Sequence, residues 1–140
     1  MIVTIDLNVI VEVLLGREDR EVCEKILTLC KRGRIDGRIP SHALPTIYYV
    51  ARRKIGHDEA LIAIDELNND LTVTPVDNAL IRKARALDIR DFEDAIVAAS
   101  AAQSKSDFII TKNSRDFAAS PVPAITPERF MREIDLSFGR

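Results

Sequence analysis

The chain has 140 residues, of which 46% are hydrophobic and 30% are charged, and its formal net charge is -2 at pH 7. This composition is that of one ordinary globular domain, and it excludes a disordered chain, a disulfide scaffold and overall electrostatic attraction to nucleic acid. No apolar run approaches membrane-spanning length, and residues 1–6 are too short and too acidic for a signal peptide. We therefore expect a single domain over residues 1–140, cytoplasmic and without a membrane partner.

Short apolar runs alternate with amphipathic stretches along the whole chain. The apolar runs predict strands, and these cover residues 2–5, 34–39, 71–75, 107–111 and 124–125. The amphipathic stretches predict helices, and with their capping residues these cover 8–15, about 19–32, 41–55, 58–67, 77–87, 91–104 and 126 onward. Asn8 can cap the first of them. Strands that alternate with helices indicate an α/β fold with a largely parallel sheet.

The two cysteines, Cys23 and Cys30, lie seven residues apart in a helical pattern. This spacing puts their Cα atoms about 10 Å apart on one helix face, which is too far for a disulfide. We expect both to be core residues in a reducing compartment. The two histidines, His42 and His57, are isolated in the sequence, and each is expected to be a surface or capping residue rather than a metal ligand.

Residues 91–94, Asp-Phe-Glu-Asp, place three carboxylates at the start of a helix that continues as an apolar run. Acids in a first turn face the positive end of the helix dipole, and taken alone the stretch is adequately explained in this way. Asp91 and Asp94 are three apart and share one face, whereas Glu93 points elsewhere and is expected to be solvated. Two carboxylates on one face repel each other unless a cation, such as a divalent metal, lies between them.

In a parallel sheet, binding sites form beyond the carboxyl ends of the strands. Asp6 follows the first predicted strand, and Thr111, Asn113 and Asp116 follow the fourth. A helix that leads into a parallel strand runs opposite to it, so the start of helix 91–104 should lie at the same edge. Each acid alone could be a strand-end or turn residue, but together they form an oxygen-rich site of the kind that suits Mg²⁺ or Mn²⁺. Such metals activate water for attack on a phosphodiester.

Three motifs occur in order and span nearly the whole chain: Ile5-Asp-Leu-Asn-Val-Ile10, Asp91-Phe-Glu-Asp-Ala-Ile96 and Ile110-Thr-Lys-Asn-Ser-Arg-Asp-Phe117. They resemble the PIN-domain ribonucleases, in particular the VapC-like toxins of prokaryotic toxin–antitoxin pairs, and the closing segment 123–130 is similar as well. The resemblance implies a three-layer αβα sandwich with a mainly parallel sheet of four to five strands. It also implies a Mg²⁺- or Mn²⁺-dependent endoribonuclease with RNA as substrate, an antitoxin protein as partner, and a homodimer.

Carried over to this sequence, the resemblance assigns three acids as catalytic residues and metal ligands: Asp6, Asp94 and Asp116. Thr111 and Asn113 match polar residues that line the same site, and Asp91 is a supporting acid beside Asp94. Lys112 and Arg115 flank the expected site and are our candidates for contacts with the RNA backbone. Two further basic clusters are more simply explained as charges at helix C-termini on a solvated face, and they lie at residues 31–38 and 52–54.

One departure from the family concerns a fourth acid, which usually lies on the helix after the second strand. This sequence has Thr46 at about that position. Either Thr46 and water fill the role, or another acid does. Glu12, one turn inside the first helix, is the best substitute, and the equal alternative is that it is a solvent-facing helix residue.

The sequence leaves three other functions open. A PIN fold without its usual fourth acid could be catalytically weak or silent and act as an RNA- or protein-binding module. A haloacid-dehalogenase-like phosphatase would require a second Asp two residues after Asp6, where this chain has Asn8. A receiver domain would require a late lysine, for which Lys112 is the candidate, but would need neither Asp94 nor Asp116. We rank the phosphatase and the receiver domain below the nuclease.

Overall fold

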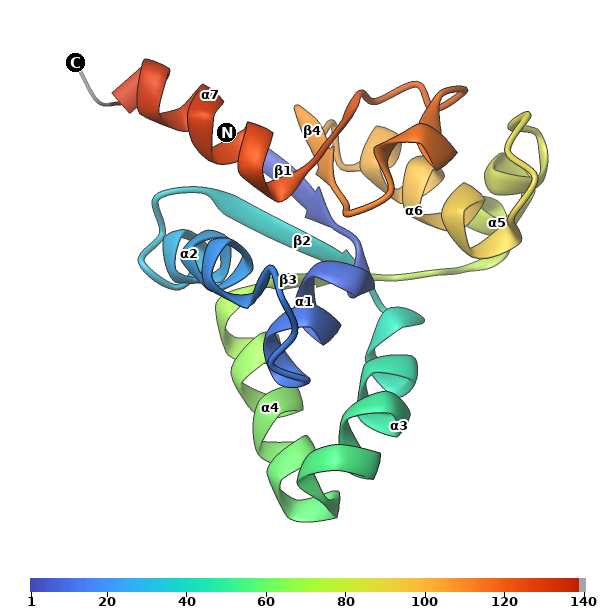
Figure 1. Ribbon diagram of the computed structural model, residues 1–140. Helices are drawn as coiled ribbons and strands as arrows, with labels where there is room; N and C mark the ends of the chain where they lie inside the picture. The colour runs from blue at the N-terminus through green and yellow to red at the C-terminus, as the bar shows by residue number, and fades with distance from the viewer. Residues whose placement is uncertain (139–140) are drawn as a thin grey trace.

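The computed structural model describes residues 1–138, with side chains described for residues 1–135. In this part of the chain five strands form one sheet (Figure 1), and they are β1 Ile2–Ile5, β2 Asp36–Pro40, β3 Thr72–Thr74, β4 Phe108–Ile110 and β5 Ala124–Ile125. The order across the sheet is β3-β2-β1-β4-β5, and each neighbouring pair is parallel. The α/β fold with a mainly parallel sheet, predicted from the sequence, is confirmed.

Helices cover both faces of this sheet. Their bounds are α1 Leu7–Leu14, α2 Arg20–Lys31, α3 Ala43–Ile55, α4 His57–Asp70, α5 Asn78–Arg85, α6 Phe92–Gln103 and α7 Pro127–Phe138, with a 3₁₀ helix η1 at Ser114–Phe117. On one face α6 packs against β1, β2 and β4 and is itself covered by α5. On the other face α2 packs against β2 and contacts α1, α4 and α7, while α3 and α4 form a hairpin that extends beyond the sheet (Figure 1). Across residues 1–138, no helix has both the length and the apolar character needed to cross a bilayer.

The central strand β1 is the point at which the sheet reverses its direction of winding. From β1, the strands β2 and β3 lie to one side, and β4 and β5 lie to the other. Such a reversal leaves a crevice at the carboxyl end of the central strand, where ligands bind in open α/β sheets. The register pairs Ile5 with Ile110, so the residues that follow them, Asp6 and Thr111, leave the sheet side by side.

The helix α6 is apolar all round because it lies between the sheet and α5. Its residues 95–101 are all buried, and all are Ala, Ile, Val or Ser, so its backbone can approach the sheet closely. The helix begins after Asp91, whose Oδ1 accepts a hydrogen bond of 2.9 Å from the N–H of Asp94. The predicted buried helix with an acidic start is therefore confirmed, and its first turn lies at the carboxyl edge of the sheet.

The start of α1 differs from the prediction that Asn8 caps it. The helix begins directly after Asp6, and Asn8 lies inside its first turn. The Asn8 side chain bonds to a distant loop instead: its Oδ1 accepts from the N–H of Lys112 at 3.2 Å, and its Nδ2 donates to Thr111 Oγ1 at 3.2 Å. Tertiary hydrogen bonds thus took the place of the local cap.

The two cysteines are free and buried on the α2 side of the sheet, as expected. Cys30 packs directly over β2. A Cβ atom at Gly37 would lie 2.5 Å from Cys30 Sγ and 2.8 Å from Leu71 Cδ2. Glycine at this position therefore allows α2 to lie close to the sheet.

Candidate functional site

Asp6 lies at the carboxyl end of β1 and is 4% exposed. Its N–H donates to the carbonyl of Ile110 at 3.0 Å, and its Oδ2 accepts from Thr111 Oγ1 at 2.8 Å. Burial raises the pKa of Asp6 to about 6, and repulsion from Glu93 adds to the shift, although the hydrogen bond from Thr111 opposes it. A nearby cation would stabilise the ionised form of such a buried carboxylate.

Asp94, in the first turn of α6, has the more strongly shifted carboxyl group. Burial raises its pKa to about 7, together with repulsion from Asp91, Asp6, Glu93 and Asp116. These repulsions link acids from β1, α6 and η1, which lie far apart in the sequence. The convergence of Asp6, Asp94 and Asp116 at one sheet edge, expected from the topology, is what the structure shows.

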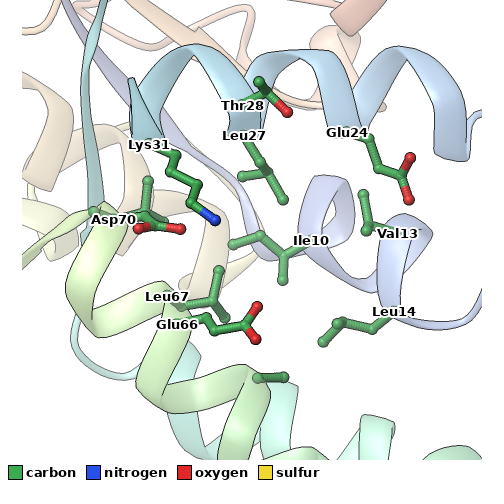
Figure 2. Close-up of a pocket in the computed structure, with 12 residues that line it drawn as sticks. Ile10, Val13, Leu14, Glu24, Leu27, Thr28, Lys31, Glu66, Leu67 and Asp70 are labelled. Atoms are coloured by element: carbon green, nitrogen blue, oxygen red, sulfur yellow. The ribbon is translucent and has the colours of Figure 1, made fainter. Parts of the chain in front are cut away.

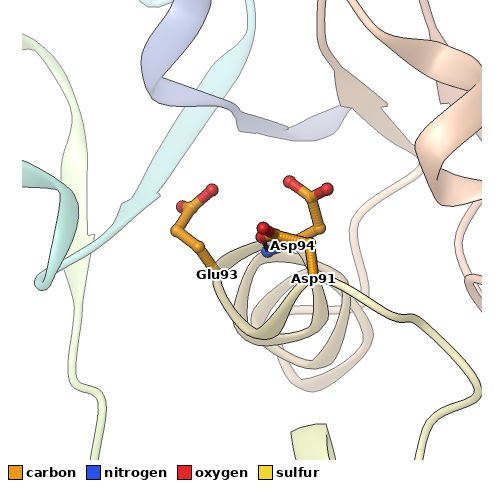
Figure 3. Close-up of side chains that lie close together, drawn as sticks. All are labelled: Asp91, Glu93 and Asp94. Atoms are coloured by element: carbon orange, nitrogen blue, oxygen red, sulfur yellow. Dashed lines mark hydrogen bonds between the residues drawn. The ribbon is translucent and has the colours of Figure 1, made fainter.

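Glu93 also belongs to this cluster, and the expectation that it is merely solvated was wrong. One carboxylate oxygen from each of Asp91, Glu93 and Asp94 lies within 4.8 Å of the others. Figure 3 shows the carboxylates of Glu93 and Asp94 pointing to the same side of α6, toward the end of β1. Helical spacing mispredicted the direction of the Glu93 side chain, because this side chain is long and contacts a residue of another element.

That partner is His42, in the connection between β2 and α3. Its Nε2 lies 2.8 Å from Glu93 Oε2, and the ring is half-buried. Its Nδ1 is buried and has no hydrogen-bond partner among the described residues, so Glu93 is the polar contact that orients the ring. His42 was expected to be a surface or capping residue. The histidine instead holds an acid of the cluster, and no spacing in the sequence signals this contact.

Asp116 lies in η1 and is exposed. Its N–H donates to the carbonyl of Asn113 at 3.1 Å. An open cavity is lined by Asp116 together with Asp91, Asp94 and Arg90. Arg90 was not among the predicted site residues. A basic residue directly before an acidic motif is a weak sequence signal, but it places a cation at the rim of this cavity.

Thr111 lies at the centre of a small hydrogen-bond network. Its hydroxyl is fully buried, donates to Asp6, and accepts from Asn8 Nδ2 and from the N–H of Asn113 at 3.1 Å. The side chain of Asn113 itself is exposed. Thr111 therefore fixes the Asp6 carboxylate, whereas the buried polar contact of Asn113 is made through its backbone.

Glu12 and Lys112 form a separate charged group beside the acid cluster. Glu12 is 2% exposed, so the reading as a solvent-facing residue was wrong. Its Oε1 lies 2.8 Å from Lys112 Nζ, its Oε2 accepts from the N–H of Asp19 at 2.8 Å, and the Lys112 ammonium also lies 3.3 Å from Asp19 Oδ2. Burial alone would raise the pKa of Glu12, but these hydrogen bonds and the nearby cationic charge outweigh it and lower the pKa.

The remaining predicted residues lie on the exposed rim. Thr46 is exposed on α3, and the residue near the start of α3 that contacts an acid of the cluster is His42. Arg115 is exposed and lines a second open cavity together with Lys112, Asn113 and Asp116. Because the Lys112 ammonium is paired with two acids, Arg115 has the more available cation of the two predicted RNA contacts.

A third surface feature is an apolar groove between α1, α2 and α4 (Figure 2). Figure 2 shows Ile10, Leu27 and Leu67 converging in its floor from three helices. Charged side chains of both signs stand at its rim, and they are Glu24, Lys31, Glu66 and Asp70. We call this feature the α1–α2–α4 groove.

The sequence model of a family described as the PIN domain matches residues 2–115. The chain belongs to the PIN domain family. No curated protein sequence matches it significantly. The family assignment agrees with the sheet order and with the acid cluster at the end of β1.

Several solved structures have a similar fold over nearly their whole length. DNA-bound VapBC from Salmonella typhimurium has a TM-score of 0.71 and 16% identity, and the match covers 91% of this chain and 98% of that one. VapBC2 from Rickettsia felis, bound to a DNA fragment from its promoter, has a TM-score of 0.68 and 15% identity, with 90% and 98% covered. VapC20 from Mycobacterium tuberculosis, described as a sarcin-ricin loop cleaving toxin, has a TM-score of 0.61 and 17% identity, with 76% and 86% covered. At these identities the matches show a shared fold and nothing further.

The donor set of this PIN domain suits a hard divalent cation. Carboxylate and hydroxyl oxygens prefer Mg²⁺ or Mn²⁺ over softer metals. Burial, and after it repulsion from neighbouring acids, raises the pKa of Asp6 to about 6 and that of Asp94 to about 7. A divalent ion would supply the missing positive charge, and the residues present therefore fit such an ion.

Proposed function

We propose that this PIN domain is a metal-dependent endoribonuclease and the toxin of a toxin–antitoxin pair. The observation that carries the proposal is the clustering of carboxylates at the carboxyl end of the central strand, where two of them, Asp6 and Asp94, have raised pKa values. Its chemistry suits Mg²⁺ or Mn²⁺. The motif resemblance to PIN-domain ribonucleases favours RNA as the substrate, and the fold similarity to VapC20, described as a sarcin-ricin loop cleaving toxin, agrees with a nuclease.

The metal ligands that we propose are Asp6, Glu93, Asp94 and Asp116. A bound Mg²⁺ or Mn²⁺ would supply the activation of water and the stabilisation of charge on the phosphodiester. Glu93 takes the place of the acid that the family usually carries near Thr46, because it reaches the cluster and Glu12 is already paired with Lys112. Thr46 is then not required as a ligand.

Neighbouring residues hold these acids and the substrate. Thr111 orients Asp6 through its hydroxyl, and His42 orients Glu93 through Nε2. Hydrogen-bonded partners of this kind fix the direction of ligands and tune their basicity. Asp91 caps α6 through the N–H of Asp94, which makes it a supporting residue. Two exposed cations at the rim, Arg90 and Arg115, are proposed to contact RNA phosphates.

The test combines metal binding with RNA cleavage on the purified chain. Isothermal titration with Mn²⁺ should show binding, and stem–loop RNA oligonucleotides should be cut when Mn²⁺ or Mg²⁺ is present and left intact with EDTA. Duplex DNA of matched length serves as the substrate control. Intact RNA binding without Mn²⁺ heat at millimolar concentration would overturn the nuclease proposal and favour the alternative of a silent RNA- or protein-binding module.

We further propose that an antitoxin binds the α1–α2–α4 groove. Two observations support this: the groove is apolar with a charged rim, and similar folds occur in toxin–antitoxin complexes. The partner to test is the product of the reading frame next to this one, co-expressed with the chain. Leu27→Asp should break the complex and Arg82→Asp on the far face should leave it intact.

The homodimer remains a prediction, to be checked by sedimentation.

A further inference from the structure

The loop that follows β4 is tied to α1 by an ion pair outside the acid cluster. Lys112 Nζ lies 2.8 Å from Glu12 Oε1 and 3.3 Å from Asp19 Oδ2. The Glu12 carboxylate is almost completely buried, and its second oxygen is held by the N–H of Asp19. Separation of this pair would leave a buried charge without a partner, which is strongly unfavourable. The pair is therefore a firm anchor, unlike an ion pair on the open surface.

Hydrogen bonds continue from this anchor into the site. The N–H of Lys112 donates to Asn8 Oδ1, and Asn8 Nδ2 donates to Thr111 Oγ1, each at 3.2 Å. Thr111 in turn donates to Asp6 Oδ2 at 2.8 Å. A displacement of Lys112 would thus be passed to Asp6 through three consecutive hydrogen bonds.

The same anchor reaches Asp116 along the loop. The N–H of Asn113 donates to Thr111 Oγ1 at 3.1 Å, and its carbonyl accepts from the N–H of Asp116 at 3.1 Å. At the far end Phe117 is buried in a core cluster. The loop is consequently fixed at two points, Lys112 and Phe117, with Asp116 between them.

We propose that Lys112 is a positioning residue that holds the 111–116 loop, so that Asp6 and Asp116 keep the geometry for binding metal. Its ammonium is occupied by Glu12 and Asp19, and it contacts neither the metal nor the RNA. This inference rests on the proposed function, since it assigns a role within the same site. It also replaces the expectation that Lys112 contacts the RNA backbone.

The test compares Mn²⁺ affinity, loop dynamics and stability in four variants of the full chain. Lys112→Met should bind Mn²⁺ at least about tenfold more weakly, as is usual when the residues that support metal ligands are removed. The amides of residues 112 and 113 should also exchange hydrogen faster, because the loop that carries these donors is no longer held against α1. Lys112→Arg should retain most of the affinity, and Lys83→Met, an exposed lysine on α5, should change nothing.

The double variant Glu12→Gln/Lys112→Met separates positioning from simple charge compensation. An amide at position 12 still accepts from the N–H of Asp19 and leaves no buried charge, so stability should return toward that of the wild type. Mn²⁺ affinity should stay weak and exchange fast, because the tether is still absent. If Mn²⁺ affinity returned together with stability, Lys112 would merely neutralise Glu12 and the proposal would be wrong.

Two further outcomes keep this proposal distinct from the proposed function. A higher KM for RNA in Lys112→Met, with unchanged Mn²⁺ affinity and exchange, would make Lys112 an RNA contact and overturn the positioning role. A wild-type chain that binds no Mn²⁺ would overturn the proposed function. In that case the exchange rates of residues 111–117 still show whether Lys112 holds the loop.

Discussion

Two groups of acids lie beside each other at the carboxyl edge of the sheet, and they differ in how their charge is balanced. Glu12 and Asp19 share the ammonium of Lys112, and the pKa of Glu12 is lowered although burial opposes the shift. Among the residues whose side chains are described, Asp6, Glu93, Asp94 and Asp116 have no lysine or arginine in an ion pair, and Glu93 alone contacts a histidine, His42. The pKa of Asp94 is raised to about 7 by burial and by its acidic neighbours. Carboxylates at a sheet edge are therefore insufficient to indicate a metal site. The informative difference is that Glu12 is directly paired with a lysine, whereas Asp6 and Asp94 are buried beside other acids and have raised pKa values.

The largest predicted effect comes from neutralising an acid of the unbalanced group. Asp94→Asn should lower the Mn²⁺-dependent RNA cleavage rate by at least about 100-fold, above the loss typical for a residue that only supports a ligand. The purified variant should stay folded by circular dichroism. Asp65→Asn, a matched change at an exposed residue of α4, should cleave at the wild-type rate. A wild-type rate in Asp94→Asn would show that the unbalanced group does not hold the catalytic metal.

The second prediction tests whether Glu93 belongs with the unbalanced acids. Glu93→Gln should weaken Mn²⁺ binding about 10- to 100-fold in a calorimetric titration, because it removes one ligand charge while keeping the side-chain size. Glu66→Gln, on α4, is the matched control. Thr46→Glu added to Glu93→Gln should recover part of the affinity, since it restores an acid where the family usually has one. Unchanged Mn²⁺ affinity in Glu93→Gln would remove Glu93 from the ligand set.

The sequence was sufficient for the features that depend on local pattern and chain direction. Hydrophobic periodicity and capping residues predicted the alternation of strands and helices. The parallel topology then placed Asp6, Asp94 and Asp116 at one edge of the sheet. The side-chain direction of Glu93 could not be predicted in this way. It depends on His42, which lies 51 residues earlier in the chain and approaches from a different element.

The balance of charge was also beyond sequence reasoning. From the sequence, Lys112 was a candidate RNA contact because it follows β4 beside the expected site, and Glu12 was either a substitute for the fourth acid or a solvent-facing helix residue. Each residue was considered alone. The structure pairs them through a contact between the β4 loop and α1, so the charge of each is cancelled by the other. Such cancellation depends on side-chain distances that no motif encodes.

The third prediction concerns how the raised pKa of Asp94 changes the stability of the metal-free protein with pH. The folded protein raises this pKa from 3.8 to about 7, so it favours the protonated acid, and its stability falls as pH rises through this interval. In metal-free protein Asp94→Asn should therefore raise Tm at pH 8 by about 2–4 °C and change little at pH 4. The effect stays small because Asp94 is partly exposed and solvent screens its charge.

Differential scanning calorimetry of both proteins with EDTA measures this effect, and Asp65→Asn again serves as the control. Added Mn²⁺ should raise the Tm of the wild type at pH 8 more than that of Asp94→Asn, since binding stabilises the folded state. A lower Tm for Asp94→Asn at pH 8 would mean that the ionised Asp94 is already compensated within the protein. The two groups of acids would then not differ as described.

The smallest predicted effect concerns the exposed cations at the rim. Arg115→Gln should weaken binding of a single-stranded RNA about two- to threefold and reduce the slope of log affinity against log salt by about 0.7, the value for one phosphate contact on a single strand. Mn²⁺ affinity should stay unchanged, because Arg115 is exposed and lies outside the proposed ligands. Lys112→Arg should leave the salt slope unchanged, since its cation remains paired with Glu12. Fluorescence anisotropy at several salt concentrations measures both slopes, and an unchanged slope for Arg115→Gln would remove this arginine from the RNA-binding surface.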